Sequence, residues 1–136
     1  MSSKNILITG ASTGFGKLTS QTLAKQGHMV IATMRDTNGK NAQQAQQLEL
    51  WAKEHNLKLG VLELDVTSDE SVNSAKEKAL QLTNDKIDVV INNAGVFGGG
   101  LVENFELADY KHLYEVNVFG SVRVTNAFLP TLRRQG

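Results

Sequence analysis

The feature that most limits the fold of this chain is a glycine-rich turn between a short apolar run and a helical pattern. The turn reads TGASTGFG at residues 9–16, and its glycines follow the spacing Gly-x-x-x-Gly-x-Gly. Glycine lets the backbone approach a ligand closely, and the helix after the turn offers N–H groups and the positive end of its dipole. The pattern therefore predicts a phosphate-binding turn for a nucleotide cofactor. A plain strand-to-helix connection is the alternative, because the spacing differs from the commoner Gly-x-Gly-x-x-Gly.

Short apolar runs alternate with helical patterns along the whole chain. We expect strands over residues 5–9, 28–34, 58–64 and 87–91, and helices over 14–26, 41–55, 69–82 and 108–129, the last ending at Pro130. Strands that alternate with helices predict a parallel sheet with right-handed crossovers. The predicted fold class is α/β, a Rossmann-type doubly wound parallel sheet with strand order 3-2-1-4 and a long helix after the fourth strand.

Two of the expected helices carry local signals. In the helix over 14–26, the three- and four-residue spacing places Leu18, Thr22 and Leu23 on the side that faces the sheet. The helix over 69–82 has Thr67 or Ser68 as its predicted N-cap, with acidic residues in its first turn.

Composition excludes several classes of protein. A chain of 136 residues that is 40% hydrophobic and 21% charged fits one globular domain, which we assign to residues 1–136. The absence of cysteine excludes disulfides and thiolate metal sites, and three scattered histidines predict no metal site. No signal peptide or membrane-length apolar stretch is present and the net charge is zero, so we expect a cytoplasmic protein with neither nucleic acid nor membrane as partner.

The neutral total charge hides an asymmetry. Residues 1–40 hold five basic residues and one acidic residue, which leaves the rest of the chain with an equal excess of negative charge. An anion would be drawn toward the N-terminal part. Solvated lysines on a helix surface are the plainer explanation of the same count.

Three motifs stand at predicted element boundaries: the turn over 9–16, Asp65-Val66 after the third strand, and the sequence NNAG at 92–95 after the fourth. Together they resemble the classical short-chain dehydrogenase/reductase family, and the resemblance covers the chain from Asn5 onward. It implies a nicotinamide dinucleotide cofactor. It also implies hydride transfer between that cofactor and a small-molecule carbonyl or secondary alcohol.

The resemblance assigns cofactor contacts to the residues of these motifs. The glycines would let the turn pass under the pyrophosphate and pack against the helix, Asp65 would bind the adenine amino group, and 93–95 would line the ribose. A helix-capping role is the alternative for Asp65. Phe15 would lie near the nicotinamide. The implied cofactor-binding residues are Gly10, Ser12, Thr13, Gly14, Phe15, Gly16, Arg35, Asp65, Val66, Asn93, Ala94 and Gly95.

The choice between NAD and NADP rests on the end of the second strand. Met34 stands where NAD-preferring relatives usually carry an acidic residue, and Arg35 follows it. An arginine can hold a 2′-phosphate with two hydrogen bonds, so the sequence favours NADP. Two features oppose this preference: Asp36 could neutralise Arg35, and Thr13 stands where some NADP enzymes have a second basic residue.

The resemblance implies one catalytic residue in this chain, and the sequence lacks the family's other catalytic residues. Asn117 matches the family's helix asparagine, which holds a water in a proton relay, and its helical neighbours Leu113 and Gly120 would allow it to point inward. A solvated asparagine on the helix surface is the alternative. The family also uses a serine and a Tyr-x-x-x-Lys pair as proton donor. No Tyr-x-x-x-Lys occurs in these residues, and Ser121 stands too close to Asn117 to be the family serine.

In the family the missing residues follow a fifth strand, and this sequence stops at Gly136. We therefore expect the N-terminal, cofactor-binding half of such an enzyme, truncated after four strands and inactive alone. The alternative is a non-catalytic dinucleotide-binding or sensor module. The fourth strand would have a free apolar edge, through which two copies would associate as a homo-oligomer.

Overall fold

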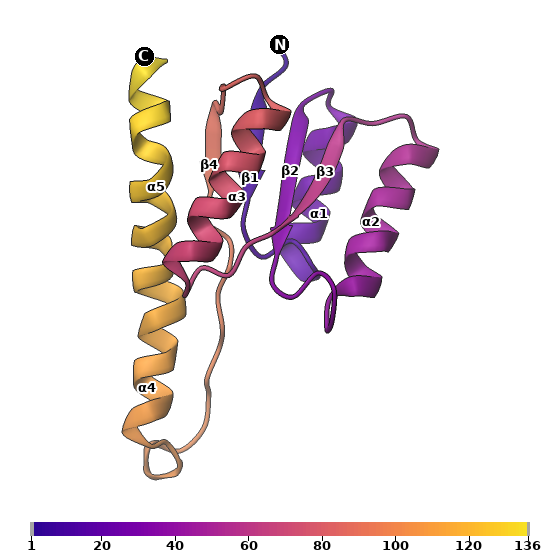
Figure 1. The fold of residues 1–136 in the computed structure, drawn as a ribbon. Coiled ribbons are helices and arrows are strands. Elements are labelled where there is room, and N and C mark those ends of the chain that lie inside the picture. The colour runs from indigo at the N-terminus through magenta and orange to yellow at the C-terminus, as the bar shows by residue number, and fades with distance from the viewer. Residues whose placement is uncertain (1, 136) are drawn as a thin grey trace.

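The computed structural model describes residues 2–135, and its centre is a four-stranded parallel sheet in the order β3-β2-β1-β4 (Figure 1). The central strand β1 pairs with β2 and with β4, so that Ile6 lies opposite Val30 on one side and Val89 on the other. The predicted fold class and strand order are confirmed. The strands are β1 (Asn5–Ile8), β2 (Met29–Met34), β3 (Leu59–Glu63) and β4 (Val89–Ile91).

Helices cover both faces of the sheet, which is the doubly wound arrangement (Figure 1). The two on one face are α1 (Gly14–Lys25) and α2 (Ala42–Glu54), and the two on the other are α3 (Asp69–Leu82) and α5 (Gly120–Arg134). Between β4 and α5 the chain forms a loop with a 3₁₀ turn (Val102–Asn104), then α4 (Leu107–Tyr114) and a π-helical segment (Glu115–Phe119) that we call the π turn.

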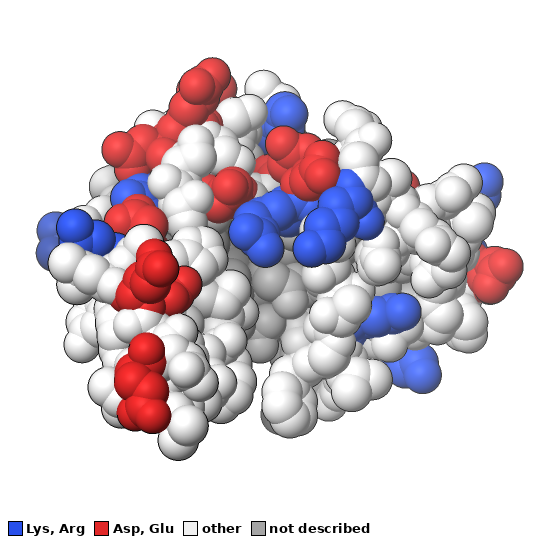
Figure 2. All heavy atoms as spheres, turned by 90° about the horizontal axis from the view of Figure 1, so that it is seen from below, with Lys and Arg blue, Asp and Glu red and all other residues white. Residues whose placement is uncertain are grey.

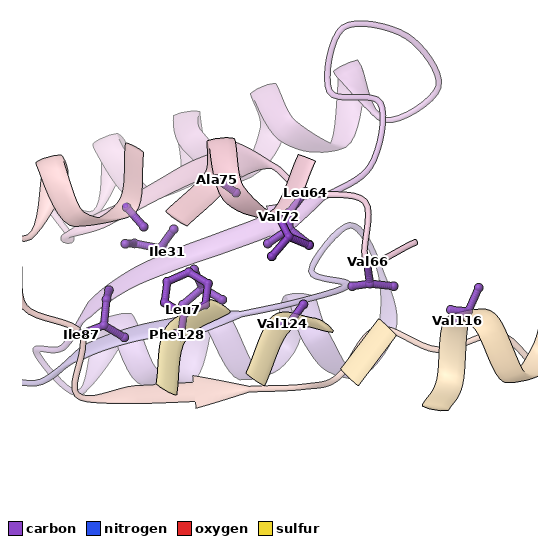
Figure 3. Packing of buried hydrophobic residues seen from close by; sticks show 11 residues of the cluster. Leu7, Ile31, Leu64, Val66, Val72, Ala75, Ile87, Val116, Val124 and Phe128 are labelled. Carbon is purple, nitrogen blue, oxygen red and sulfur yellow. The ribbon is translucent and has the colours of Figure 1, made fainter. Parts of the chain in front are cut away.

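Alternating residues of the central strands form two cores, because successive side chains of a strand point to opposite faces. Leu7 and Ile31 are fully buried on the α3 and α5 side, whereas Ile8 and Val30 are buried on the α1 and α2 side. Figure 3 shows the first of these cores between the two helices and the sheet. Its helix residues include Val72, Ala75, Val124 and Phe128.

The prediction for the inward face of α1 was wrong for Leu18 and Thr22, whereas Leu23 is half-buried and packs against the core on this side of the sheet, as predicted. Leu18 is 61% exposed and Thr22 is also exposed, whereas Gly16, Ser20 and Ala24 are buried. These three small residues repeat every four positions and bring the helix close to the turn and the sheet. The Ser20 hydroxyl donates to the Gly16 carbonyl at 2.8 Å, so the one polar group on this face is satisfied.

The predicted helix end at Pro130 was also wrong, because α5 continues to Arg134 with the proline inside it. Proline removes one helical hydrogen bond and normally kinks or ends a helix. Here tertiary contacts hold the segment beyond it: Thr131 is buried, and the Gln135 side chain donates to the carbonyl oxygens of Ile87 (2.9 Å) and Thr131 (3.0 Å).

The predicted cap of α3 is confirmed, since Ser68 is its N-cap and its hydroxyl accepts the N–H of Ser71 at 3.2 Å. At the end of the sheet, β4 pairs with β1 on one side, and Val89 is 37% exposed. Association of two copies through this edge stays a prediction. Within residues 2–135, no helix has the length and apolar character needed to cross a bilayer.

Asp88 joins the starts of β1 and β4. Its carboxylate accepts the N–H of Asn5 at 2.7 Å, its own N–H donates to the Asn5 carbonyl at 2.9 Å, and Lys86 Nζ lies 3.4 Å from its other oxygen. The hydrogen bond from the Asn5 N–H, opposed by partial burial and helped by Lys86, lowers the pKa of Asp88 below its ordinary value.

We expect Asp88→Asn to lower the free energy of unfolding at neutral pH by about 1–3 kcal/mol, because a charged acceptor of a backbone N–H is lost. A lowered pKa stabilises the fold above the ordinary aspartate pKa of about 3.9, and this stabilisation is lost as the pH falls through the lowered value. Urea unfolding measured from about pH 7 to pH 2 should therefore show that the difference in free energy of unfolding between the unmodified chain and Asp88→Asn becomes smaller in acid. The exposed Glu49→Gln is the matched control; an equal loss in both variants would contradict the assignment.

Candidate functional site

The carboxyl ends of the four strands open onto one cleft of about 900 Å³. Figure 2 looks onto this face from below and shows a hollow near its centre with Lys and Arg side chains at its rim. Of the residues that the sequence assigns to cofactor and catalysis, all but Gly14 and Asn117 line this cleft. The lining residues from that set are Gly10, Ser12, Thr13, Phe15, Gly16, Arg35, Asp65, Val66, Asn93, Ala94 and Gly95.

The glycine turn is built so tightly that two of its positions exclude any side chain. Gly10 has φ +70°, and a Cβ there would lie 2.7 Å from the Cα of Ala94. A Cβ on Gly16 would collide with the Gly10 carbonyl oxygen and lie 2.5 Å from Asn93 Nδ2. The turn and the start of α1 are thus in direct backbone contact with each other and with the segment after β4.

Asn93 holds the turn against that segment. Its amide donates to the carbonyl oxygens of Thr9 (2.9 Å) and Gly10 (3.0 Å), while the Thr9 hydroxyl accepts the N–H groups of Asn93 and Ala94 at 3.1 and 3.0 Å. The Asn93 amino group is therefore engaged by the protein backbone. Asn92 is exposed, and its amide donates to the Thr125 hydroxyl on α5 at 3.0 Å.

Two of the helices that begin at the cleft have no side-chain caps. Neither α1 nor α2 has a side-chain hydrogen bond at its N-cap or an acidic residue in its first turn. By contrast, Ser68 caps α3, and Asp109 in the first turn of α4 accepts the N–H of Glu106 at 2.8 Å. Because the first N–H groups of a helix lack intrahelical partners, the two helix starts at the cleft offer donors and positive dipole ends to a ligand.

The remaining residues of the turn are open to solvent. Thr13 is the N-cap of α1 and is exposed, Ser12 is half-buried, and the ring of Phe15 is 84% exposed at the cleft rim. Gly14 begins α1 with φ +56°, and a Cβ at this position would meet nothing within 4 Å. Hydroxyl groups and a free aromatic face are therefore available on this side of the cleft.

The segment after β2 brings two cations to the cleft and engages both nearby carboxylates, those of Asp36 and Glu63, the latter accepting the N–H and the hydroxyl of Thr37 at 3.1 and 2.9 Å. Arg35 and Lys40 both line the cleft, and neither forms an ion pair with residues 2–135. The Asp36 carboxylate accepts the N–H of Lys40 at 2.7 Å, and the Asn41 amide donates to the Arg35 carbonyl at 2.7 Å. Asp36 therefore closes the turn that leads into α2 instead of pairing with Arg35.

Asp65 lines the opposite part of the cleft. One of its carboxylate oxygens accepts the N–H and the hydroxyl of Thr67 at 2.9 and 2.7 Å, and its own N–H donates to the Ser71 hydroxyl at 2.8 Å. The cap of α3 is Ser68, so the alternative assignment of Asp65 as that cap was wrong. The next residue, Val66, is buried at 5% exposure.

Asn117 lies in the middle of the π turn and is exposed, and its side-chain amide faces the loop after β4. Its amide forms two hydrogen bonds with the backbone of one residue of the loop after β4. The N–H of Val96 donates to Asn117 Oδ1, and Asn117 Nδ2 donates to the Val96 carbonyl, both at 2.8 Å. The assigned role in a proton relay stays a prediction.

The sequence analysis missed two basic residues. Lys40 precedes the N-terminus of α2, where a positive charge opposes the helix dipole, and that unfavourable placement was an available signal. Arg123 on α5 bonds to Asp69, Glu115 and the Val66 carbonyl, which no local pattern reveals. Burial opposes its charge, but these carboxylates more than offset that and raise the pKa of Arg123 above its ordinary value. Across residues 2–135, no three His, Asp or Glu side chains gather as metal ligands.

Comparisons with known proteins agree with this geometry. A family model described as short chain dehydrogenase matches residues 4–136. An uncharacterized oxidoreductase, YusZ, of Bacillus subtilis is 36% identical over all of this chain and 46% of its own length. Estradiol 17-beta-dehydrogenase 2 of Mus musculus is 38% identical over 96% of this chain and 33% of its own length.

Among solved structures, the NADPH-bound carbonyl reductase from chicken fatty liver superposes with a TM-score of 0.85 and 30% identity. The match covers 98% of this chain and 53% of that chain. The present chain thus spans about half, or less, of the length of the proteins that it matches.

Proposed function

Because this chain belongs to the short-chain dehydrogenase family, we propose that its cleft binds NADP(H). In this proposal the chain supplies the cofactor-binding part of an oxidoreductase that acts on a small-molecule carbonyl or secondary alcohol. The observation that carries the proposal is the single cleft that gathers the glycine turn, Arg35, Asp65 and residues 93–95 at the carboxyl ends of the strands. The NADPH held by the carbonyl reductase with the same fold supports it.

The residues present fit a dinucleotide. The turn has no side chain at Gly10 and Gly16, so a pyrophosphate can approach the backbone and the uncapped start of α1. Asp65 retains a second carboxylate oxygen for the adenine amino group, and residues 93–95 also line the cleft, where the ribose would bind. The bound cofactor would supply the hydride, while these residues bind and orient it.

The preference for NADP over NAD rests on charge at the end of β2. Met34 puts no carboxylate there to accept the ribose hydroxyls, and the Asp36 carboxylate is engaged by the N–H of Lys40. Arg35, Lys40 and the uncapped start of α2 all stand at this part of the cleft. We propose that they bind the 2′-phosphate together, Arg35 with two hydrogen bonds and Lys40 as a point charge.

The 136 residues contain no Tyr-x-x-x-Lys, so we expect this chain alone to bind NADPH without reducing a carbonyl. The alternative, a non-catalytic dinucleotide-binding or sensor module, makes the same prediction for binding. Carbonyl reduction by the 136 residues at a measurable rate would contradict both. The substrate, a cytoplasmic location and the association of two copies stay predictions.

Binding is tested by calorimetric titration with NADPH and NADH. We expect NADPH to bind at least about ten-fold more tightly, because one charge-assisted interaction is worth about 1.4 kcal/mol or more. Arg35→Glu should remove this preference, since the new carboxylate repels the 2′-phosphate and can accept ribose hydroxyls. Arg133→Glu makes the same charge change at an exposed position of α5 and serves as control. Equal affinities of the unmodified chain for both cofactors would overturn the NADP assignment, and no binding of either would overturn the function.

A further inference from the structure

We propose that Arg123 is a positioning residue that couples the adenine end of the cleft to the π turn and, through Asn117, to the loop after β4. The inference rests on the proposed cofactor site. It adds a residue outside the cleft that links two parts of the cleft lining.

The Arg123 guanidinium joins three separate segments. Its Nη1 donates to the Val66 carbonyl at 2.6 Å, its Nη2 to Glu115 Oε1 at 2.8 Å, and its Nε to Asp69 Oδ1 at 2.5 Å. These partners belong to the β3–α3 loop, the π turn and the first turn of α3. A planar, permanently charged group with a fixed fork of donors can hold three such acceptors in one geometry.

Gly120 lets the β3–α3 loop pack directly against α5. It lies one turn before Arg123, and a Cβ at this position would lie 2.7 Å from Val66 Cγ2. Val66 and Val116 are both 5% exposed, belong to one core cluster and line the cleft. Figure 3 shows both at the same end of that cluster. A shift of the helix here would therefore move the loop that carries Asp65.

The π turn carries the connection onward. Glu115, bound by Arg123, is its first residue, and Asn117 is its third. The two hydrogen bonds between Asn117 and the Val96 backbone then fix the loop after β4, and Asn117 Oδ1 lies 3.1 Å from the position of a Cβ on Gly95. π turns are rare and concentrate at functional sites. A continuous set of contacts thus runs from Val66 to Val96.

The exposure of the partners argues against a purely stabilising role. The side chains of Asp69 and Glu115 are 82% and 40% exposed, whereas that of Arg123 is 21% exposed. Ion pairs with exposed carboxylates contribute little to stability, because solvent screens them. The bond to the Val66 carbonyl fixes orientation, so losing Arg123 should disturb the cleft more than it disturbs the fold.

The test measures amide hydrogen exchange at Val96, whose N–H donates to Asn117 Oδ1. The probe is adenosine 2′,5′-bisphosphate, which carries the adenine and the 2′-phosphate without the nicotinamide. In the unmodified chain this probe should slow exchange at Val96. In Arg123→Met the probe should bind roughly ten-fold more weakly, and at saturation it should no longer slow that exchange. Without any ligand, Arg123→Met should already exchange faster at Val96, with little change in melting temperature.

Arg133→Met on the same helix is the matched control and should behave as the unmodified chain. If Arg123→Met does not fold, Arg123→Lys keeps the charge but lacks the planar fork whose three nitrogens reach three separate acceptors, and it should show the same loss of coupling. The inference is overturned if the probe slows Val96 exchange equally in these variants, or not at all in the unmodified chain that binds it. Failure of the unmodified chain to bind the probe or NADPH would overturn the proposed function instead, and the ligand-free exchange rates report on Arg123 separately.

Discussion

Replacing Gly16 with alanine is expected to abolish measurable NADPH binding and to lower the free energy of unfolding by about 1–3 kcal/mol, the usual cost of overpacking. A Cβ at this position collides with the Gly10 carbonyl oxygen, which is a backbone atom, and crowds the side-chain amide of Asn93, which is held by hydrogen bonds to the Thr9 and Gly10 carbonyl oxygens. Relief requires α1 to move away from the turn. That movement would misplace the N–H groups proposed to face the pyrophosphate.

Calorimetric titration with NADPH and urea unfolding measure the two effects of Gly16→Ala separately. Gly60→Ala on β3 is the matched control, because a Cβ there meets only Leu82 at an ordinary 3.9 Å. It should leave both binding and stability nearly unchanged. Retention of full affinity by Gly16→Ala would show that the turn is not where the pyrophosphate binds.

Phe128→Ala should give the largest loss of stability, about 3–5 kcal/mol, because it combines lost apolar burial with a cavity. Phe128 is fully buried and lies in the core between α5 and the sheet, near Leu7 (Figure 3). A loss of this size is a large part of the typical stability of a domain, about 5–15 kcal/mol. It would also loosen α5, which carries Arg123 and Gly120.

Urea unfolding at neutral pH measures this prediction, with the midpoint and the slope reported separately. The matched control is Phe97→Ala, since that ring is 94% exposed and should change stability by no more than about 0.5 kcal/mol. Comparable losses in the two variants would mean that α5 does not hold the sheet through Phe128.

The elements of the fold follow from the sequence because their signals are local. Apolar runs between turn residues mark the strands, and the handedness of crossovers then leaves few strand orders. Periodicity predicts large apolar residues such as Leu18 on the inward face of α1, and for Leu18 this prediction was wrong. Close packing against the turn instead selected Gly16, Ser20 and Ala24. Proline predicts a helix end at position 130, but α5 continues because its last turn is held by a contact with Ile87, which is far away in sequence.

The candidate site was predictable where its residues lie within two residues of a strand end, as Gly10, Arg35, Asp65 and Asn93 do. Parallel strands bring these positions to one edge of the sheet whatever the side chains are. The engagement of Asp36 by the turn before α2, and the π turn itself, depend on hydrogen bonds that no spacing rule predicts. The contacts of Arg123 could not be predicted for the same reason, since its partners belong to three different segments of the chain.

The absence of side-chain caps on α1 and α2 has a consequence for the stability of the protein. A ligand whose phosphates bind there would accept hydrogen bonds from the N-terminal N–H groups of both helices and so act as the cap that the chain does not supply. Such a ligand binds only the folded chain and so stabilises it in proportion to the logarithm of its concentration, about 2.7 kcal/mol at one hundred times Kd. The abundance of the folded protein would then follow the supply of the proposed dinucleotide around it, oxidised or reduced, whether or not any substrate is turned over.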